Sequence, residues 1–109
     1  MFANVPEVNA TEVPADGYLL DVRENDEWAA GHAPAAVHIP LGELNARAGE
    51  VPRDREVYVV CRAGGRSGQA VAALNNAGWT TVNVAGGMQS WHGAGLDMAA
   101  DTDAEPRVI

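Results

Sequence analysis

The chain has 109 residues, 47% of them hydrophobic and 20% charged, which is typical of one globular domain with a single core. Seven basic residues, all arginine, stand against fifteen acids, and the net charge of -8 argues against nucleic acid or an anionic membrane as partner. Because a single cysteine cannot form an internal disulfide, and no signal peptide or membrane span is evident, we expect a cytoplasmic protein. The three histidines are scattered, so we expect no metal and no cofactor.

The chain up to residue 56 predicts short strands that alternate with short helices. The expected elements are an edge strand at residues 5–8, a helical turn at 11–13, a strand at 18–22, a helix ending at Gly31, a strand at 37–39 and a helix at 41–48. The helix before Gly31 has acids in its first turn, which makes Asn25 or Asp26 the expected N-cap.

The next stretch carries the chain's only cysteine. Residues 57–60 are an apolar run typical of a strand buried on both faces, and residues 69–77 have helical spacing that ends at Gly78. Cys61 lies between them, at the start of a loop with two glycines. A loop that leads into a helix N-terminus points several N–H groups inward, so a thiolate, a persulfide or a bound oxyanion would be stabilised there.

The rest of the chain predicts a strand at residues 79–84, a helix at 88–93 and an acidic segment without periodicity. We therefore expect an N-terminal segment at 1–11, a domain at 12–97 and a flexible tail at 98–109. The alternation indicates an α/β fold with three layers, in which helices cover both faces of a mostly parallel, five-stranded central sheet. Sites in such sheets form beyond the carboxyl ends of strands, where Cys61 and residues 85–87 are both expected.

Four blocks of the sequence resemble the rhodanese-homology domain, the sulfurtransferase fold. They are residues 20–24, 31–40, 61–67 and 86–91, and their order and spacing also match across about residues 12–97. The chain departs from the family pattern at Ala35, where glycine is usual, and at His38, where asparagine is frequent. Both positions lie outside the cysteine loop, so they bear on local turn geometry rather than on chemistry.

The resemblance implies a single-domain sulfurtransferase with Cys61 as its catalytic nucleophile. Sulfane sulfur would pass from thiosulfate or a persulfide donor to Cys61, and from the resulting persulfide to cyanide or a thiol. The predicted substrate-binding residues are Arg62, Ala63, Gly64, Gly65, Arg66 and Ser67. A cation at Arg66 opposes the helix dipole, which favours a contact with an anionic donor, whereas Arg62 fits either such a contact or solvent.

Other polar and aromatic residues have structural interpretations. We expect Asp21 to have a capping or an ion-pair role, and Arg23 to form an ion pair with an acid such as Glu27. The imidazole of His32 is expected to bond a backbone group rather than to act as a base. The three tryptophans are expected to pack in the core or at its rim.

Two other functions remain open. A phosphatase or arsenate reductase of the same fold needs five residues between cysteine and arginine, whereas four separate Cys61 from Arg66. The loop here therefore forms a smaller ring, which suits a single sulfur atom rather than phosphate. A non-catalytic module, or a relay whose sulfur donor or acceptor is another protein, is the second alternative.

Overall fold

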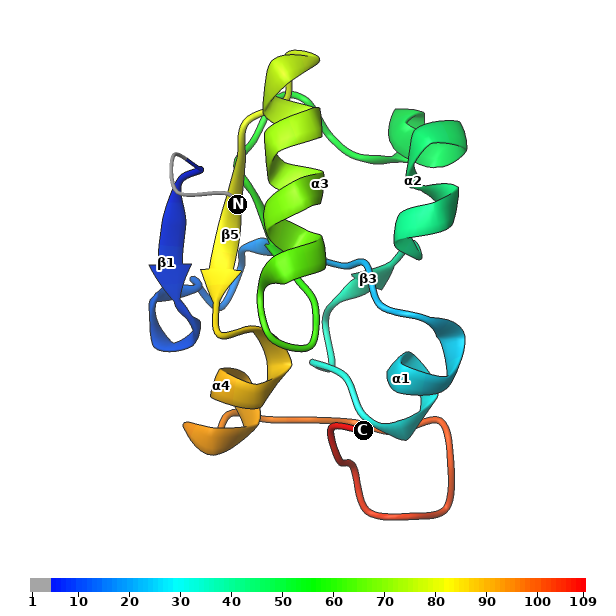
Figure 1. The fold of residues 1–109 in the computed structure, drawn as a ribbon. Coiled ribbons are helices and arrows are strands. Elements are labelled where there is room, and N and C mark those ends of the chain that lie inside the picture. Colours follow the sequence, from blue (N-terminus) through cyan, green and yellow to red (C-terminus); the bar gives the residue numbers. More distant parts are fainter. Residues whose placement is uncertain (1–4) are drawn as a thin grey trace.

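Parallel strands form one sheet in the computed structural model, which describes residues 5–109 (Figure 1). Its five strands are β1 (Glu7–Asn9), β2 (Tyr18–Asp21), β3 (Val37–His38), β4 (Val57–Val60) and β5 (Thr81–Ala85). They lie in the order β1-β5-β4-β2-β3, and every neighbouring pair is parallel. β4 is therefore central, and its apolar run is buried at all four positions. The predicted α/β class is confirmed, and the first four residues of the predicted N-terminal segment lie outside the described part.

Crossover helices cover both faces of the sheet. The helices are α1 (Asn25–Ala30), α2 (Leu41–Arg47), α3 (Gly65–Asn76) and α4 (Gly87–Gly93), with short 3-10 turns η1 (Ala10–Glu12) and η2 (Ala48–Glu50). Alternate residues of β4 face opposite sides: Val59 packs with Val71 of α3, whereas Val60 packs with Met88 of α4. None of the helices described in residues 5–109 has both the length and the hydropathy that crossing a bilayer requires.

Three helices begin earlier than the sequence predicts, α4 by a single residue, at Gly87. The N-cap of α1 is Glu24, not Asn25 or Asp26, because the Glu27 carboxylate reaches back and accepts the Glu24 N–H at 2.9 Å. The helix expected at 69–77 begins at Gly65, since Gly64 alone, with φ of +114°, makes the turn out of the cysteine loop. A short loop of this kind places the N-terminal turn of α3 directly beside Cys61.

Residues 98–109, for which the sequence predicts a flexible tail, make backbone contacts with α1. This segment runs back along α1 (Figure 1), where the N–H groups of Asp101 and Arg107 donate to the carbonyls of Ala29 and Ala30, at 2.9 and 3.0 Å. Carbonyls at a helix C-terminus have no partner within the helix, so the segment supplies the donors that α1 lacks. Hydrophobic periodicity cannot reveal such contacts, because they use the backbone.

A buried ion pair lies at the carboxyl end of β2. Arg23 pairs with Asp21 at 2.7 Å rather than with Glu27 as predicted, and both side chains are fully buried. The Arg23 guanidinium also donates to the carbonyl of Gly31 at 2.8 Å. The pair thereby ties the end of β2 to the end of α1. The ion-pair role expected for Asp21 is confirmed.

We expect Asp21→Asn to lower the free energy of unfolding by about 3 kcal/mol, because it leaves the Arg23 charge buried without a counter-charge. Urea denaturation of the two proteins measures the difference. Glu43→Gln is the matched control, because it removes one carboxylate of an exposed pair with Arg47 and should change stability little. Equal losses in both variants would contradict the assignment of a structural role to the buried pair.

Candidate active site

Cys61 directly follows β4, at the carboxyl edge of the sheet, and its side chain is buried, with 1% of the residue exposed. The loop that begins there ends at Gly65, where α3 starts. Gly86 and Gly87, which follow β5, lie at the same edge, as the sequence predicts for a parallel sheet. A nucleophile placed here is held by a rigid strand on one side and by a helix on the other.

Hydrogen-bond donors converge on the sulfur of Cys61. The N–H of Gly64 lies 3.0 Å from Sγ and the hydroxyl oxygen of Ser67 lies 3.2 Å from it. Burial alone raises the pKa of the thiol, but bonds from the Ser67 hydroxyl and from the N–H groups of Ser67, Gly64 and Ala63 outweigh burial and leave the pKa below its usual value. The site therefore favours the thiolate, which is the nucleophilic form.

The loop keeps this shape because α4 binds its carbonyl groups. Met88 N–H donates to the carbonyl of Cys61 at 2.8 Å, and Gln89 N–H donates to that of Arg62 at 3.0 Å. A trans peptide points its N–H away from its C=O, so fixing the Arg62 carbonyl turns the next N–H, that of Ala63, toward the sulfur. Gly87 permits this close approach: a Cβ there would lie 2.4 Å from the Cys61 carbonyl oxygen, and φ is +57°.

Asn83 and Glu7 belong to this site, although the sequence analysis did not select them. The Asn83 amide nitrogen donates to Glu7 Oε2 at 2.9 Å and to the Gly64 carbonyl at 3.2 Å, so its oxygen faces Ser67 Oγ at 2.6 Å. A hydroxyl has one proton, so Ser67 can donate either to Asn83 or to Cys61, but not fully to both. The signal in the sequence was an amide side chain between two valines of a strand.

The two arginines of the loop have protein partners. Arg66 forms two parallel bonds to the carboxylate of Glu27, at 2.7 and 2.9 Å. The bond from Arg66, working against burial, lowers the pKa of Glu27 to about 2, so that carboxylate is ionised at any ordinary pH. Arg62 is exposed and donates through Nε to the carbonyl of Ile109 at 2.9 Å. The anion-binding role predicted for both arginines thus competes with contacts inside the chain.

The histidines and tryptophans near α1 are structural. Trp28 stacks between His32, with ring centroids 3.7 Å apart, and His38, at 4.7 Å. Nδ1 of His32 is 2.8 Å from the carbonyl oxygen of Trp28, which confirms the backbone bond that we expected. Across residues 5–109, no three histidine, cysteine or carboxylate side chains lie close enough together to bind a metal ion.

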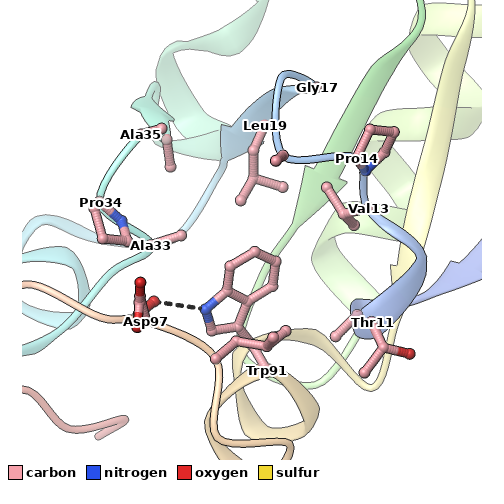
Figure 2. Close-up of a pocket in the computed structure, with 14 residues that line it drawn as sticks. Thr11, Val13, Pro14, Gly17, Leu19, Ala33, Pro34, Ala35, Trp91 and Asp97 are labelled. Carbon is pink, nitrogen blue, oxygen red and sulfur yellow. Dashed lines mark hydrogen bonds between the residues drawn. The ribbon is translucent and has the colours of Figure 1, made fainter.

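A separate hollow of about 360 Å³ lies among η1, the segment before β2 and α4 (Figure 2). Leu19, Val13 and Trp91 point into it, and the indole N–H of Trp91 donates to the carbonyl of Asp97 at 2.9 Å. Its lining is mostly apolar and does not include Cys61. The hollow therefore lies apart from the cysteine loop.

Comparison with known proteins places these features in a family. Residues 7–94 match the family model described as Rhodanese-like domain. "Putative sulfurtransferase YtwF" of Bacillus subtilis (strain 168) is 42% identical over 82 residues, which are 75% of this chain and 80% of that protein. "Putative sulfur carrier protein YrkF" of the same organism is 43% identical over 76 residues, which are 69% of this chain but 41% of that longer protein. The crystal structure of a rhodanese-related protein from Thermoplasma volcanium covers 86% of this chain and 97% of its own, with a TM-score of 0.82 and 33% identity.

We expect Ser67→Ala to raise the pKa of Cys61, because the hydroxyl is a donor to the sulfur. The midpoint of the pH profile for alkylation by iodoacetamide should rise by about one pH unit, which leaves less thiolate at neutral pH. Ser90→Ala, an exposed serine on α4, is the control and should keep the wild-type profile. A midpoint that stays in place or falls in Ser67→Ala would contradict the donor role.

We expect Gly87→Ala to displace the cysteine loop, because the added methyl group overlaps the Cys61 carbonyl and the residue must keep a positive φ. The free energy of unfolding should fall by about 2–4 kcal/mol, with slower alkylation of Cys61 in the protein that remains folded. Gly93→Ala in the same helix adds a methyl group into open space and should keep or slightly increase stability. Similar behaviour of both variants would show that the close approach of Gly87 is unimportant.

Proposed function

The chain belongs to the rhodanese-like family and is a relative of sulfurtransferases, and from that premise we propose that Cys61 carries sulfane sulfur as a persulfide. The match over residues 7–94 confirms the resemblance drawn from the four sequence blocks. One observation carries the proposal: N–H and O–H donors converge on the buried sulfur of the chain's only cysteine. The same donors can bind the outer sulfur of a persulfide, which also carries negative charge.

In the first step, the Cys61 thiolate attacks the outer sulfur of the donor. With thiosulfate the S–S bond breaks, sulfite leaves with the bonding electron pair, and the enzyme holds the persulfide anion. With a persulfide donor the leaving group is the donor's thiolate. In the second step, cyanide or a thiolate attacks the outer sulfur, the S–S bond to Cys61 breaks and the Cys61 thiolate is regenerated. No base is required, because the loop already favours the thiolate.

The size of the loop supports sulfur transfer over phosphate chemistry. Four residues separate Cys61 from Arg66, and the loop's N–H groups lie at bonding distance from the cysteine sulfur itself. A tetrahedral oxyanion needs a wider ring of donors. A phosphatase or arsenate reductase is therefore the weaker alternative.

A relay between proteins is the alternative that the relatives favour. One of them is named a sulfur carrier protein, and this chain matches 41% of it. In that version of the proposal the persulfide on Cys61 is the same, but a protein donates or accepts the sulfur. Thiosulfate would then be a poor donor.

Intact mass spectrometry tests the persulfide. The purified protein should gain one sulfur atom after incubation with thiosulfate or with a small persulfide, and cyanide should remove it. Cys61→Ser should gain none, because a hydroxyl does not form this intermediate. Initial rates with both substrates varied should give parallel lines, as a two-step exchange requires.

Several results would overturn the proposal. Failure to gain sulfur from either kind of donor, or gain of sulfur by Cys61→Ser, would exclude the Cys61 persulfide. Converging initial-rate lines would exclude the two-step exchange. Turnover of an aryl phosphate that Cys61→Ser abolishes would favour the phosphatase instead.

A further inference from the structure

The guanidinium of Arg66, which the sequence predicts to contact an anionic donor, already has a carboxylate partner. Its two terminal nitrogens donate to the two oxygens of Glu27, which lies 39 residues earlier in the chain, on α1. Paired bonds of this kind are how a guanidinium also recognises a sulfonate, a carboxylate or a phosphate. An anionic donor therefore needs the same nitrogens that Glu27 holds.

Glu27 is held in place and keeps its charge. Its Oε1 also accepts the N–H of Glu24, at 2.9 Å, and its side chain is 13% exposed, against 34% for Arg66. With a pKa of about 2, the carboxylate stays ionised at any pH at which the enzyme works. The bond from the Glu24 N–H restrains the Glu27 side chain, and a mild change in pH does not protonate its carboxylate. Both effects keep Glu27 paired with Arg66.

The charges that face Arg66 add to this effect. The negative charges of Glu24 and of the Cys61 sulfur, together with Glu27, stabilise the charged form of Arg66. The cation of Arg23, from the buried pair with Asp21, stabilises the ionised form of Glu27. The loop's other cation, Arg62, is bonded to the carbonyl of Ile109. A dianion that approaches Cys61 would thus meet Arg66 already neutralised by a neighbouring carboxylate.

We propose that Glu27 is a specificity-determining residue that competes with anionic donors for Arg66 and selects persulfide donors over thiosulfate. The inference rests on the proposed function. Thiosulfate carries a sulfonate group beside the sulfur to be transferred, and that group needs a cation. An alkyl persulfide carries no such group, and its outer sulfur needs only the N–H groups of Gly64 and its neighbours. Both donors leave the same persulfide on Cys61, so the two reactions differ only in how the donor binds and reacts.

The test uses intact mass spectrometry to measure the rates at which two donors load sulfur onto Cys61. The donors are thiosulfate and the persulfide of 2-mercaptoethanol, which has no charged group besides its outer sulfur, and the readout is the ratio of their rate constants. Glu27→Gln keeps the size of the side chain but removes its charge, so the ratio of thiosulfate to persulfide loading should rise about tenfold. Glu27→Asp retains the charge and should raise that ratio less than Glu27→Gln does.

Glu43→Gln is the matched control, because it also removes a carboxylate from an ion pair with arginine, on α2 instead of α1. Its donor ratio should equal that of the wild type. A general loss of structure in Glu27→Gln would slow both donors and leave the ratio where it was. A ratio equal to that of the wild type in Glu27→Gln, together with an unchanged rate of loading from the persulfide, overturns the inference while the proposed function stands. Absence of loading from both donors in the wild type would overturn the proposed function itself, and the inference with it.

Discussion

The convergence of donors on the Cys61 sulfur depends on two hydrogen bonds that do not touch that sulfur. They run from the N–H groups of Met88 and Gln89 to the carbonyls of Cys61 and Arg62. Each peptide unit is a rigid plane, so a helix that holds the oxygen on one side also directs the adjoining N–H to the other. The loop would otherwise be free to point carbonyl oxygens at the sulfur and to repel a thiolate. The fold supplies this restraint by bringing the start of α4 against the end of β4, which a parallel sheet does by placing both at one edge.

The stabilisation at Cys61 comes from backbone and hydroxyl dipoles more than from the arginines. Both guanidiniums in the loop are bonded within the chain, Arg66 to Glu27 and Arg62 to Ile109. Dipoles fixed in a buried site are screened little by dissolved salt, whereas exposed ions are screened strongly. A protein with a net charge of -8 can therefore stabilise a negative charge on the Cys61 sulfur without a basic surface around it.

Local sequence predicted the sheet and the cysteine loop well, because both follow from short segments. Apolar runs gave β2 and β4, and the glycines after Cys61 predicted a turn into a helix. Apart from the helix starts at Glu24 and Gly65, the errors concern contacts between distant segments. The partner of Glu27 proved to be Arg66 rather than Arg23, and Asn83 proved to contact Ser67 beside the cysteine. Such contacts depend on how the crossovers bring the elements together, and neither residue spacing nor hydropathy encodes that.

The bond between Asn83 and Glu7 joins the neighbourhood of the sulfur to the outermost strand of the sheet. These two residues are 76 positions apart, and β1 is paired on one side only, with β5. An edge strand of three residues is among the first elements to detach in local opening, at a free energy far below that of global unfolding. Detachment of β1 removes Glu7, one of the two acceptors that orient the Asn83 amide, and leaves the Gly64 carbonyl as the other. The hydrogen bonds around the Cys61 sulfur therefore extend to the outermost strand of the sheet, and they are complete only when β1 is paired with β5.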